Sequence, residues 1–227
     1  MKILSQGKEY IAVHKPSGLM VYSDQKENEN LSAQLQLEKQ IKRKVFPVHR
    51  IDKDTCGVLV YALSGAMAQE LTKLFRTRVV RKQYLAIVHG KTPPKATIDS
   101  PLQKHKEKVM EAAITDFVTI ASAEIELGGE LRSYSLVRVD PKTGRFHQIR
   151  RHLKSMGHPI VGDPEYGNQW NNDRFQESFG VKRTLLSAVL LFFPDRTAQK
   201  MQRVETKPDP DFQRVLKALK LEQSHPR

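Results

Sequence analysis

The stretch Val48–Gly57, VHRIDKDTCG, holds the densest set of reactive side chains in the chain. It lies between a proline and a continuous apolar run typical of a buried strand, so we expect a loop that presents side chains from a rigid sheet edge. Asp52 follows His49 and Arg50 there. Its carboxylate can act as a nucleophile or can close an Asx-type turn, and for an arbitrary turn aspartate the second role is commoner. The residue types alone leave both roles open.

A second group of polar side chains lies on a helix predicted from about residue 145 to 156, between the turn signal at 140–144 and Gly157. Its cations recur at helical spacing on one face: His147, Arg150, Arg151 and Lys154. Because like charges at this spacing repel, we expect an anion or a carboxylate nearby. Arg150 lies at the border with the apolar face, from which its guanidinium fork can reach a carboxylate in a pocket. A solvated basic face is the competing interpretation.

Metal and cofactor motifs are missing from the sequence. His147 and His152 are five residues apart and point to different helix faces, and no cysteine lies near them, so we expect no zinc site. No glycine-rich phosphate loop of Walker or Rossmann type is present, and the turn at 162–167 is a weak sign of nucleotide binding. We therefore expect a protein without metal or cofactor.

The composition points to an acidic partner. Among 227 residues, 38 Lys and Arg face 25 Asp and Glu, a net charge of +13, which favours nucleic acid over a membrane surface. The single cysteine, Cys56, excludes an internally disulfide-bonded scaffold. No apolar run approaches the ~20 residues of a membrane span, and the N-terminus does not resemble a signal peptide. We expect a cytoplasmic monomer with no membrane partner.

Hydrophobic periodicity predicts more strands than helices. Strands are expected at 10–14, 58–63, 84–89, 114–120, 123–127, 133–139 and 185–193, with a hairpin turn at Gly128–Gly129. Helices are expected at 31–43, 65–78, 145–156, within 165–180, and at 211–221. Because the strands are often consecutive, the pattern predicts an α+β fold with a mixed, mostly antiparallel sheet flanked by helices and loops. No linker interrupts the chain, so 1–227 is expected to form one domain.

Several segments together resemble the RluA-type pseudouridine synthases. His49-Arg-Ile-Asp52 with Thr55-Cys-Gly57 is similar to the active-site signature His-Arg-Leu-Asp followed by Thr-Ser-Gly. The family's other segments are matched in the same order, and the resemblance covers about residues 3 to 193. The matching segments are HKPSG at 14–18, KQYLAIVHG at 82–90, TGRFHQIR at 143–150 and GHPIVGD at 157–163.

This resemblance implies the isomerisation of uridine to pseudouridine within RNA. It implies that Asp52 is the nucleophile, that Arg150 holds Asp52 ionised and oriented, and that Tyr84 stacks on the uracil and helps to remove its C5 proton. Arg50 matches the family arginine that takes the place of the flipped nucleotide. The remaining basic candidates for RNA contact are His49, His147, Arg151 and Lys154.

The resemblance leaves several choices open. The segments 150–153 and 167–180 are most similar to a family member that modifies tRNA, while 23S rRNA remains the alternative substrate. A catalytically inactive RNA-binding protein and a glycosidic hydrolase are further alternatives, as are attack at ribose C1′ or uracil C6. Cys56 replaces a serine, and Ser187 replaces a histidine whose role is therefore in doubt here. Because Ile3 already begins the pattern, we expect no N-terminal accessory RNA-binding domain.

Overall fold

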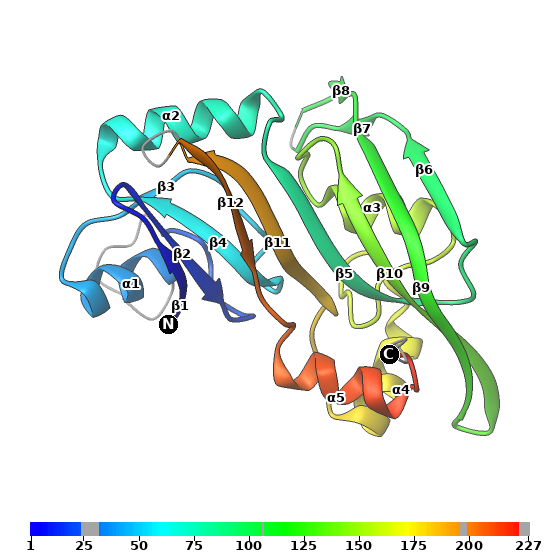
Figure 1. Ribbon diagram of the computed structural model, residues 1–227. Coiled ribbons are helices and arrows are strands. Elements are labelled where there is room, and N and C mark those ends of the chain that lie inside the picture. Colours follow the sequence, from blue (N-terminus) through cyan, green and yellow to red (C-terminus); the bar gives the residue numbers. More distant parts are fainter. Residues whose placement is uncertain (24–31, 106, 196–198, 223–227) are drawn as a thin grey trace. The chain divides into compact units, whose positions relative to one another are not determined.

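A computed structural model describes residues 1–23, 32–105, 107–195 and 199–222 (Figure 1). The chain forms two compact units. Unit 1 comprises Met1–Lys82 with Ser187–Pro208, and unit 2 comprises Gln83–Leu186 with the segment from Asp209 onward. The expectation of a single domain over 1–227 stays a prediction.

Unit 1 is built on a sheet whose strand order is β1-β2-β4-β11, with β3 paired to β4 and β12 paired to β11. The pairings within unit 1 are antiparallel except that of β4 with β11, which is parallel where Ser187 faces Cys56. The strands are β1 (Lys2–Gln6), β2 (Tyr10–Lys15), β3 (Phe46–Pro47), β4 (Cys56–Ala62), β11 (Leu186–Asp195) and β12 (Lys200–Glu205).

The described residues of unit 1 include two helices, and each begins at a serine cap. The hydroxyl of Ser32 accepts the Leu35 N–H at the start of α1 (Ala33–Ile41), and Ser64 does the same for Met67 in α2 (Gly65–Arg76). The buried face of α2 packs on β4 through Leu71 and Leu74. Every residue of β4 is buried, as the apolar run predicted. Residue 31, the expected start of the first helix, lies outside the described residues.

Unit 2 contains an antiparallel sheet in the order β5-β10-β9-β6. The two strands expected at 114–120 and 123–127 form one long strand, and a register shift opposite Leu136 and Val137 marks where the pattern broke. Gly128 and Gly129 both have positive φ, 61° and 79°, as the predicted tight hairpin turn requires. The strands are β5 (Arg81–His89), β6 (Lys95–Asp99), β9 (Ile114–Leu127) and β10 (Glu130–Pro141), with a separate hairpin of β7 (Leu102–Gln103) and β8 (Met110–Glu111).

Among its described residues, unit 2 also has the helices α3 (Gln148–Ser155), α4 (Gln169–Phe179) and α5 (Pro210–Ala218). Ile149 and Leu153 of α3 pack in one cluster with the sheet, and Phe175, Phe212 and Val215 pack in another. The described helices include none that is both long and apolar enough to cross a membrane. The α+β class with a mostly antiparallel sheet is confirmed.

The helix expected from residue 145 begins three residues later. His147 has φ 50°, in the left-handed region, so it cannot continue a right-handed helix, and α3 starts at Gln148. Met156 follows Ile149 and Leu153 at helical spacing, which predicts the same apolar face, yet it is exposed. Arg150 and His152 are instead buried with Ile149 and Leu153. The spacing therefore located the helix but assigned one side chain to the wrong surface.

Candidate active site

Asp52 lies in a tight turn immediately before β4. Its backbone carbonyl accepts a hydrogen bond from the Thr55 N–H at 3.2 Å, and its side chain is half-buried. Thr55 itself is buried at the start of the strand. This turn is closed by a backbone hydrogen bond, which does not involve the Asp52 carboxylate. The position of Asp52 in a turn therefore does not exclude a role for its carboxylate as a nucleophile.

The segment His14–Gly18 fixes the backbone around Asp52. Lys15 is fully buried, and its ammonium donates to three backbone carbonyls, those of Pro16 at 3.0 Å, Leu19 at 2.7 Å and Lys53 at 2.8 Å. The Ser17 hydroxyl donates to the Asp54 carbonyl at 2.8 Å, and the Gly18 N–H donates to the Lys53 carbonyl at 3.0 Å. A buried ammonium is tolerated because these oxygens replace water. Sequence reasoning matched this segment but gave Lys15 no role.

His49 and Arg50 differ in their surroundings. The His49 ring stacks on Phe75 at 4.4 Å between centroids, and its Nε2 accepts the Val60 N–H at 3.0 Å. Burial, and to a lesser extent the charge of Lys82, lower the pKa of His49 to about 3, so the ring is neutral near pH 7. These contacts favour a structural role for His49 over the predicted RNA contact. Arg50 is exposed, and its predicted contact with RNA stays a prediction.

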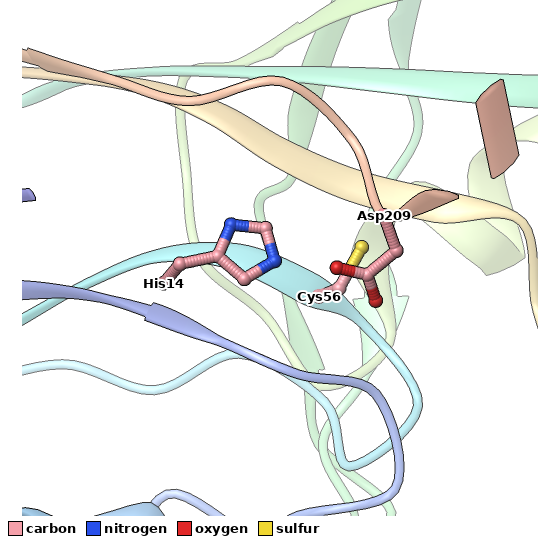
Figure 2. A group of neighbouring side chains, drawn as sticks. All are labelled: His14, Cys56 and Asp209. Atoms are coloured by element: carbon pink, nitrogen blue, oxygen red, sulfur yellow. The ribbon is translucent and has the colours of Figure 1, made fainter. Parts of the chain in front are cut away.

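The two departures from the family pattern are neighbours in unit 1. Cys56 is buried at the start of β4 and faces Ser187 in the parallel register, and the Ser187 hydroxyl is buried without a hydrogen-bond partner among the described residues. Figure 2 shows the Cys56 thiol together with His14 of β2, whose Nδ1 lies 3.0 Å from the Thr206 hydroxyl. Gly57 follows at φ +114°, where an added Cβ would lie 2.0 Å from the Ala188 carbonyl oxygen, so the signature requires glycine here.

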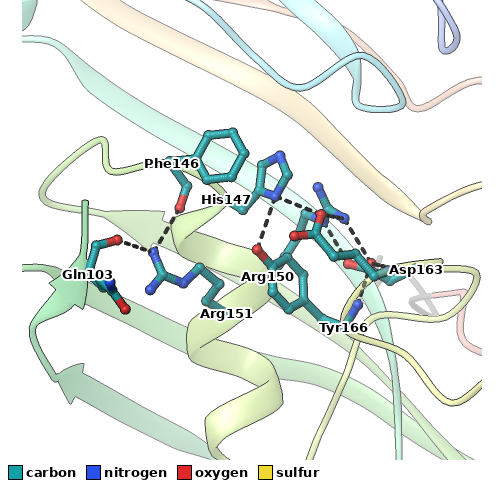
Figure 3. Close-up of polar contacts among 8 residues, drawn as sticks. Gln103, Phe146, His147, Arg150, Arg151, Asp163 and Tyr166 are labelled. Carbon is teal, nitrogen blue, oxygen red and sulfur yellow. Dashed lines mark hydrogen bonds and ion pairs between the residues drawn. The ribbon is translucent and has the colours of Figure 1, made fainter. Parts of the chain in front are cut away.

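In unit 2, Arg150 forms a bidentate ion pair with Asp163 (Figure 3). Nε donates to Oδ2 at 2.6 Å and Nη2 donates to Oδ1 at 2.8 Å, and both residues are buried. Burial raises the pKa of the Asp163 carboxyl, but hydrogen bonds from Arg150 and from the N–H groups of Tyr166 and Glu165 lower it more, so the net pKa lies below its ordinary value. The pair is therefore ionised near neutral pH.

The guanidinium of Arg150 is held on further sides as well. It lies 4.9 Å from the centre of the Tyr166 ring, and Nη2 is 3.5 Å from a Glu165 oxygen. The border position on the helix correctly indicated an arginine reaching a buried carboxylate. That carboxylate is Asp163, which sequence reasoning missed, although it ends the matched segment at 157–163. The predicted pairing of Arg150 with Asp52 stays a prediction.

Gln148 is a second residue that sequence reasoning missed. Its Oε1 accepts the Thr143 hydroxyl at 2.6 Å and the Arg145 N–H at 3.0 Å, while Nε2 donates to the Ile114 carbonyl and the Thr115 hydroxyl, both at 2.9 Å. This buried amide ties the turn before α3 to β9. It fixes the direction in which α3, and with it Arg150, leaves the sheet.

The other predicted cations lie just before α3 and along it. His147 Nδ1 lies 3.2 Å from both the Tyr166 hydroxyl and a Glu165 oxygen (Figure 3). Arg151 donates to the Gln103 carbonyl at 2.9 Å, and Lys154 is exposed. The expected basic face is therefore divided: Arg150 points inward, while Lys154 meets solvent. RNA contacts by His147, Arg151 and Lys154 stay predictions.

Tyr84 lies on β5 opposite Val139 of β10. Its side chain is half-buried and packs against the cluster that includes Val137 and Ile149. This packing restricts the ring, as a stacking residue would need. Its role in proton removal stays a prediction.

A profile of the family described as RNA pseudouridylate synthase matches residues 9–155, which is more than half of the chain. The chain belongs to the RNA pseudouridylate synthase family. Among curated relatives, tRNA pseudouridine synthase C of Haemophilus ducreyi is 39% identical over 215 residues, which cover 88% of each protein. The protein of the same name from Pasteurella multocida is 37% identical over 207 residues, 85% of each.

Solved structures of this family share the fold. Human RNA Pseudouridylate Synthase Domain Containing 1 superposes with a TM-score of 0.74 at 27% identity, covering 92% of this chain and 83% of that one. Human RNA Pseudouridylate Synthase Domain Containing 4 gives the same score at 25% identity, covering 96% and 93%. As a pseudouridylate synthase, the protein is an isomerase, and the resemblance found in its motifs is confirmed at the level of the family.

Proposed function

We propose that this pseudouridine synthase isomerises one uridine of tRNA, with Asp52 as its nucleophile. The observation that carries the tRNA assignment is the similarity to two proteins named tRNA pseudouridine synthase C, at 39% and 37% identity and over at least 85% of both partners. Because the similarity spans at least 85% of the length of those relatives, the same class of RNA is proposed as the substrate.

The reaction breaks the N1–C1′ glycosidic bond and forms a C5–C1′ bond, while C5 loses a proton and N1 gains one. No electrons or groups are exchanged with another molecule. The enzyme therefore needs a nucleophile that can attack and leave again, and an ionised carboxylate meets both requirements. Asp52 can form its adduct at ribose C1′ or at uracil C6, and trapping the adduct distinguishes the two.

Arg150 and Tyr84 are proposed to assist this carboxylate. The fork of Arg150 is held by Asp163, so its charge and direction are set before RNA binds. The phenol of Tyr84 is proposed to stack on the uracil and to take part in removing the C5 proton. Because a free phenol has a pKa of about 10, this proton transfer requires the bound substrate to tune it.

RNA binding is proposed to extract the target nucleotide from its stack. Arg50 is exposed, and a planar guanidinium can fill the vacated position while bonding to phosphate. Arg151 and Lys154 are proposed to contact phosphates, since their charges add to a chain with net charge +13. Recognition by backbone shape suits a compact RNA such as tRNA.

The test uses unmodified tRNA transcripts and 23S rRNA stem-loops carrying tritium at uracil C5, because the reaction releases that hydrogen to water. We expect release from one uridine of an intact tRNA and little from unfolded fragments. Conversion of rRNA stem-loops with every tRNA untouched would overturn the tRNA assignment and leave the enzyme class intact. Free uracil as the product would indicate a hydrolase, and binding without conversion an inactive RNA-binding protein.

A further inference from the structure

Three aromatic rings form a column where the β7–β8 hairpin meets the start of α3. The Phe146 ring lies 4.1 Å from His105 and 3.6 Å from His147, with interplanar angles of 28° and 22°. Two rings this close and this nearly parallel cannot share one face of Phe146, so His105 and His147 cover opposite faces. His105 is exposed, whereas Phe146 and His147 are half-buried. In the described part of the chain, Phe146 is the one ring in contact with His105.

The column is held rigidly from both ends. The left-handed backbone of His147 and the contacts of its ring with Glu165 and Tyr166 fix the inner end (Figure 3). At the outer end, Arg151 donates to the Gln103 carbonyl at 2.9 Å, which ties the hairpin to α3. A second tie is the ion pair of Arg145 with Glu111 at 2.8 Å. A platform ordered in advance loses little entropy when it binds a ligand.

Lysines occur in both elements that carry the column. Lys104 and Lys108 lie in the same hairpin as His105, and Lys154 is exposed on α3. Lys104 pairs with Glu107 at 2.6 Å, while Lys108 and Lys154 add two further exposed positive charges. An open aromatic face beside cations suits a ligand that combines a flat π-system with phosphate, as every nucleotide does.

We propose that the exposed face of His105 stacks a nucleobase of the RNA substrate, one that neighbours the target uridine. The inference rests on the proposed action on RNA, and it adds a specific contact that the reaction itself does not require. His147, the inner ring, precedes Arg150 by three residues, so the column begins beside the arginine assigned to the chemistry. Base stacking on an aromatic side chain is tolerant of sequence, so the contact contributes affinity more than base identity.

The experiment places 2-aminopurine, whose fluorescence falls on stacking, at each position flanking the target uridine of a tRNA transcript. Wild type is compared with His105→Ala, with His105→Tyr as the conservative variant that restores a ring, and with Val109→Ala as a control at an exposed site of the same hairpin. We expect His105→Ala to lose the quenching at one position and to raise KM about tenfold with kcat within about threefold. His105→Tyr and Val109→Ala should stay near wild type.

If wild type is active and His105→Ala shows unchanged quenching and KM, the stacking inference is overturned, while the proposed function is not affected. Loss of quenching in His105→Tyr as well would also overturn it, since stacking would not be restored by a ring. If wild type converts a 23S stem-loop instead of tRNA, the tRNA proposal fails, and the same four proteins are then measured on that stem-loop. The stacking inference is thereby judged separately from the choice of RNA.

Discussion

Arg150 and Asp163 form a buried, bidentate ion pair in which Nε lies 2.6 Å from Oδ2 and Nη2 lies 2.8 Å from Oδ1. The partners are thirteen residues apart, one on α3 and one in the turn after Ile160. Removing one member leaves the other buried without its opposite charge, which costs more than the pair contributes. The pair therefore sets both the stability of this region and the direction of the arginine.

Asp163→Asn is expected to lower the free energy of unfolding by about 3–5 kcal/mol, because the Arg150 charge stays buried without the opposite charge of Asp163. Urea unfolding at pH 7 measures this. The matched control is Asp116→Asn. Asp116 forms a solvent-exposed ion pair with Lys142, with 2.9 Å between Oδ2 and Nζ, and its loss should lower the free energy of unfolding by less than about 1 kcal/mol. Equal losses in the two variants would contradict a special role for the buried pair.

The same pair predicts a pH dependence. The pKa of Asp163 lies below its ordinary value in the folded protein. At a pH between the folded and unfolded pKa values, the folded state therefore binds fewer protons than the unfolded state. Its contribution to stability is complete above the unfolded pKa of about 3.9 and is lost as the pH falls through the folded value. The stability difference between wild type and Asp163→Asn should therefore narrow below about pH 4. A difference that widens there would show the opposite sign of the pKa change.

Arg150→Lys keeps the charge and loses the fork that Asp163 orients. We expect kcat to fall about 100-fold or more, with KM within about threefold, since misplacing a catalytic group affects turnover more than binding. Steady-state tritium release gives both constants. A raised KM with normal kcat would instead make Arg150 a phosphate contact.

Asp52→Asn should abolish pseudouridine formation and bind RNA at least as tightly as wild type. The amide keeps the shape of the side chain, cannot act as the nucleophile, and removes a negative charge near phosphates. Asp54→Asn, two residues along the same loop, is the control and should retain activity within about threefold. Asp52→Asn activity within tenfold of wild type would rule out the nucleophile assignment.

Patterns that reflect a single physical requirement were readable in the sequence. The apolar run at 58–63 is typical of a strand buried on both faces, and Gly128–Gly129 supplied the positive φ that a tight hairpin turn needs. The ordered motifs identified the family without any structure. Each of these signals is local or fixed in order, so no knowledge of long-range packing was needed.

Other features depended on contacts that periodicity does not register. Histidine adopts a left-handed backbone more often than most residues, but periodicity does not use that weak signal at His147, so the start of α3 was placed too early. The buried partner of Arg150 lies beyond the helix, and the wheel that placed Arg150 at a border could not identify it. The strands β6 and β12 were missed because short strands of mixed polarity lack a clear alternation.

RNA affinity should fall steeply with salt. Each neutralised phosphate contributes about −0.7 to −0.9 to the slope of log association constant against log salt, so several contacts give a slope of about −3 or steeper. Lys154→Gln, at an exposed site on α3, should make the slope shallower by about one such step. Filter binding between dilute and physiological salt measures both. A wild-type slope near zero would contradict the proposed role of the basic surface.

Lys15→Met should damage the loop that carries Asp52. Methionine fills a similar volume but leaves the carbonyls of Pro16, Leu19 and Lys53 without their shared donor in a buried place. We expect a loss of about 2–4 kcal/mol in the free energy of unfolding. We also expect kcat to fall at temperatures where the variant is still folded, because the turn at Asp52 loses its tie to β2. Lys44→Met, at an exposed position of unit 1, controls for loss of a positive charge and should change neither quantity by much. A fully active, fully stable Lys15→Met variant would show that the three hydrogen bonds do not position Asp52.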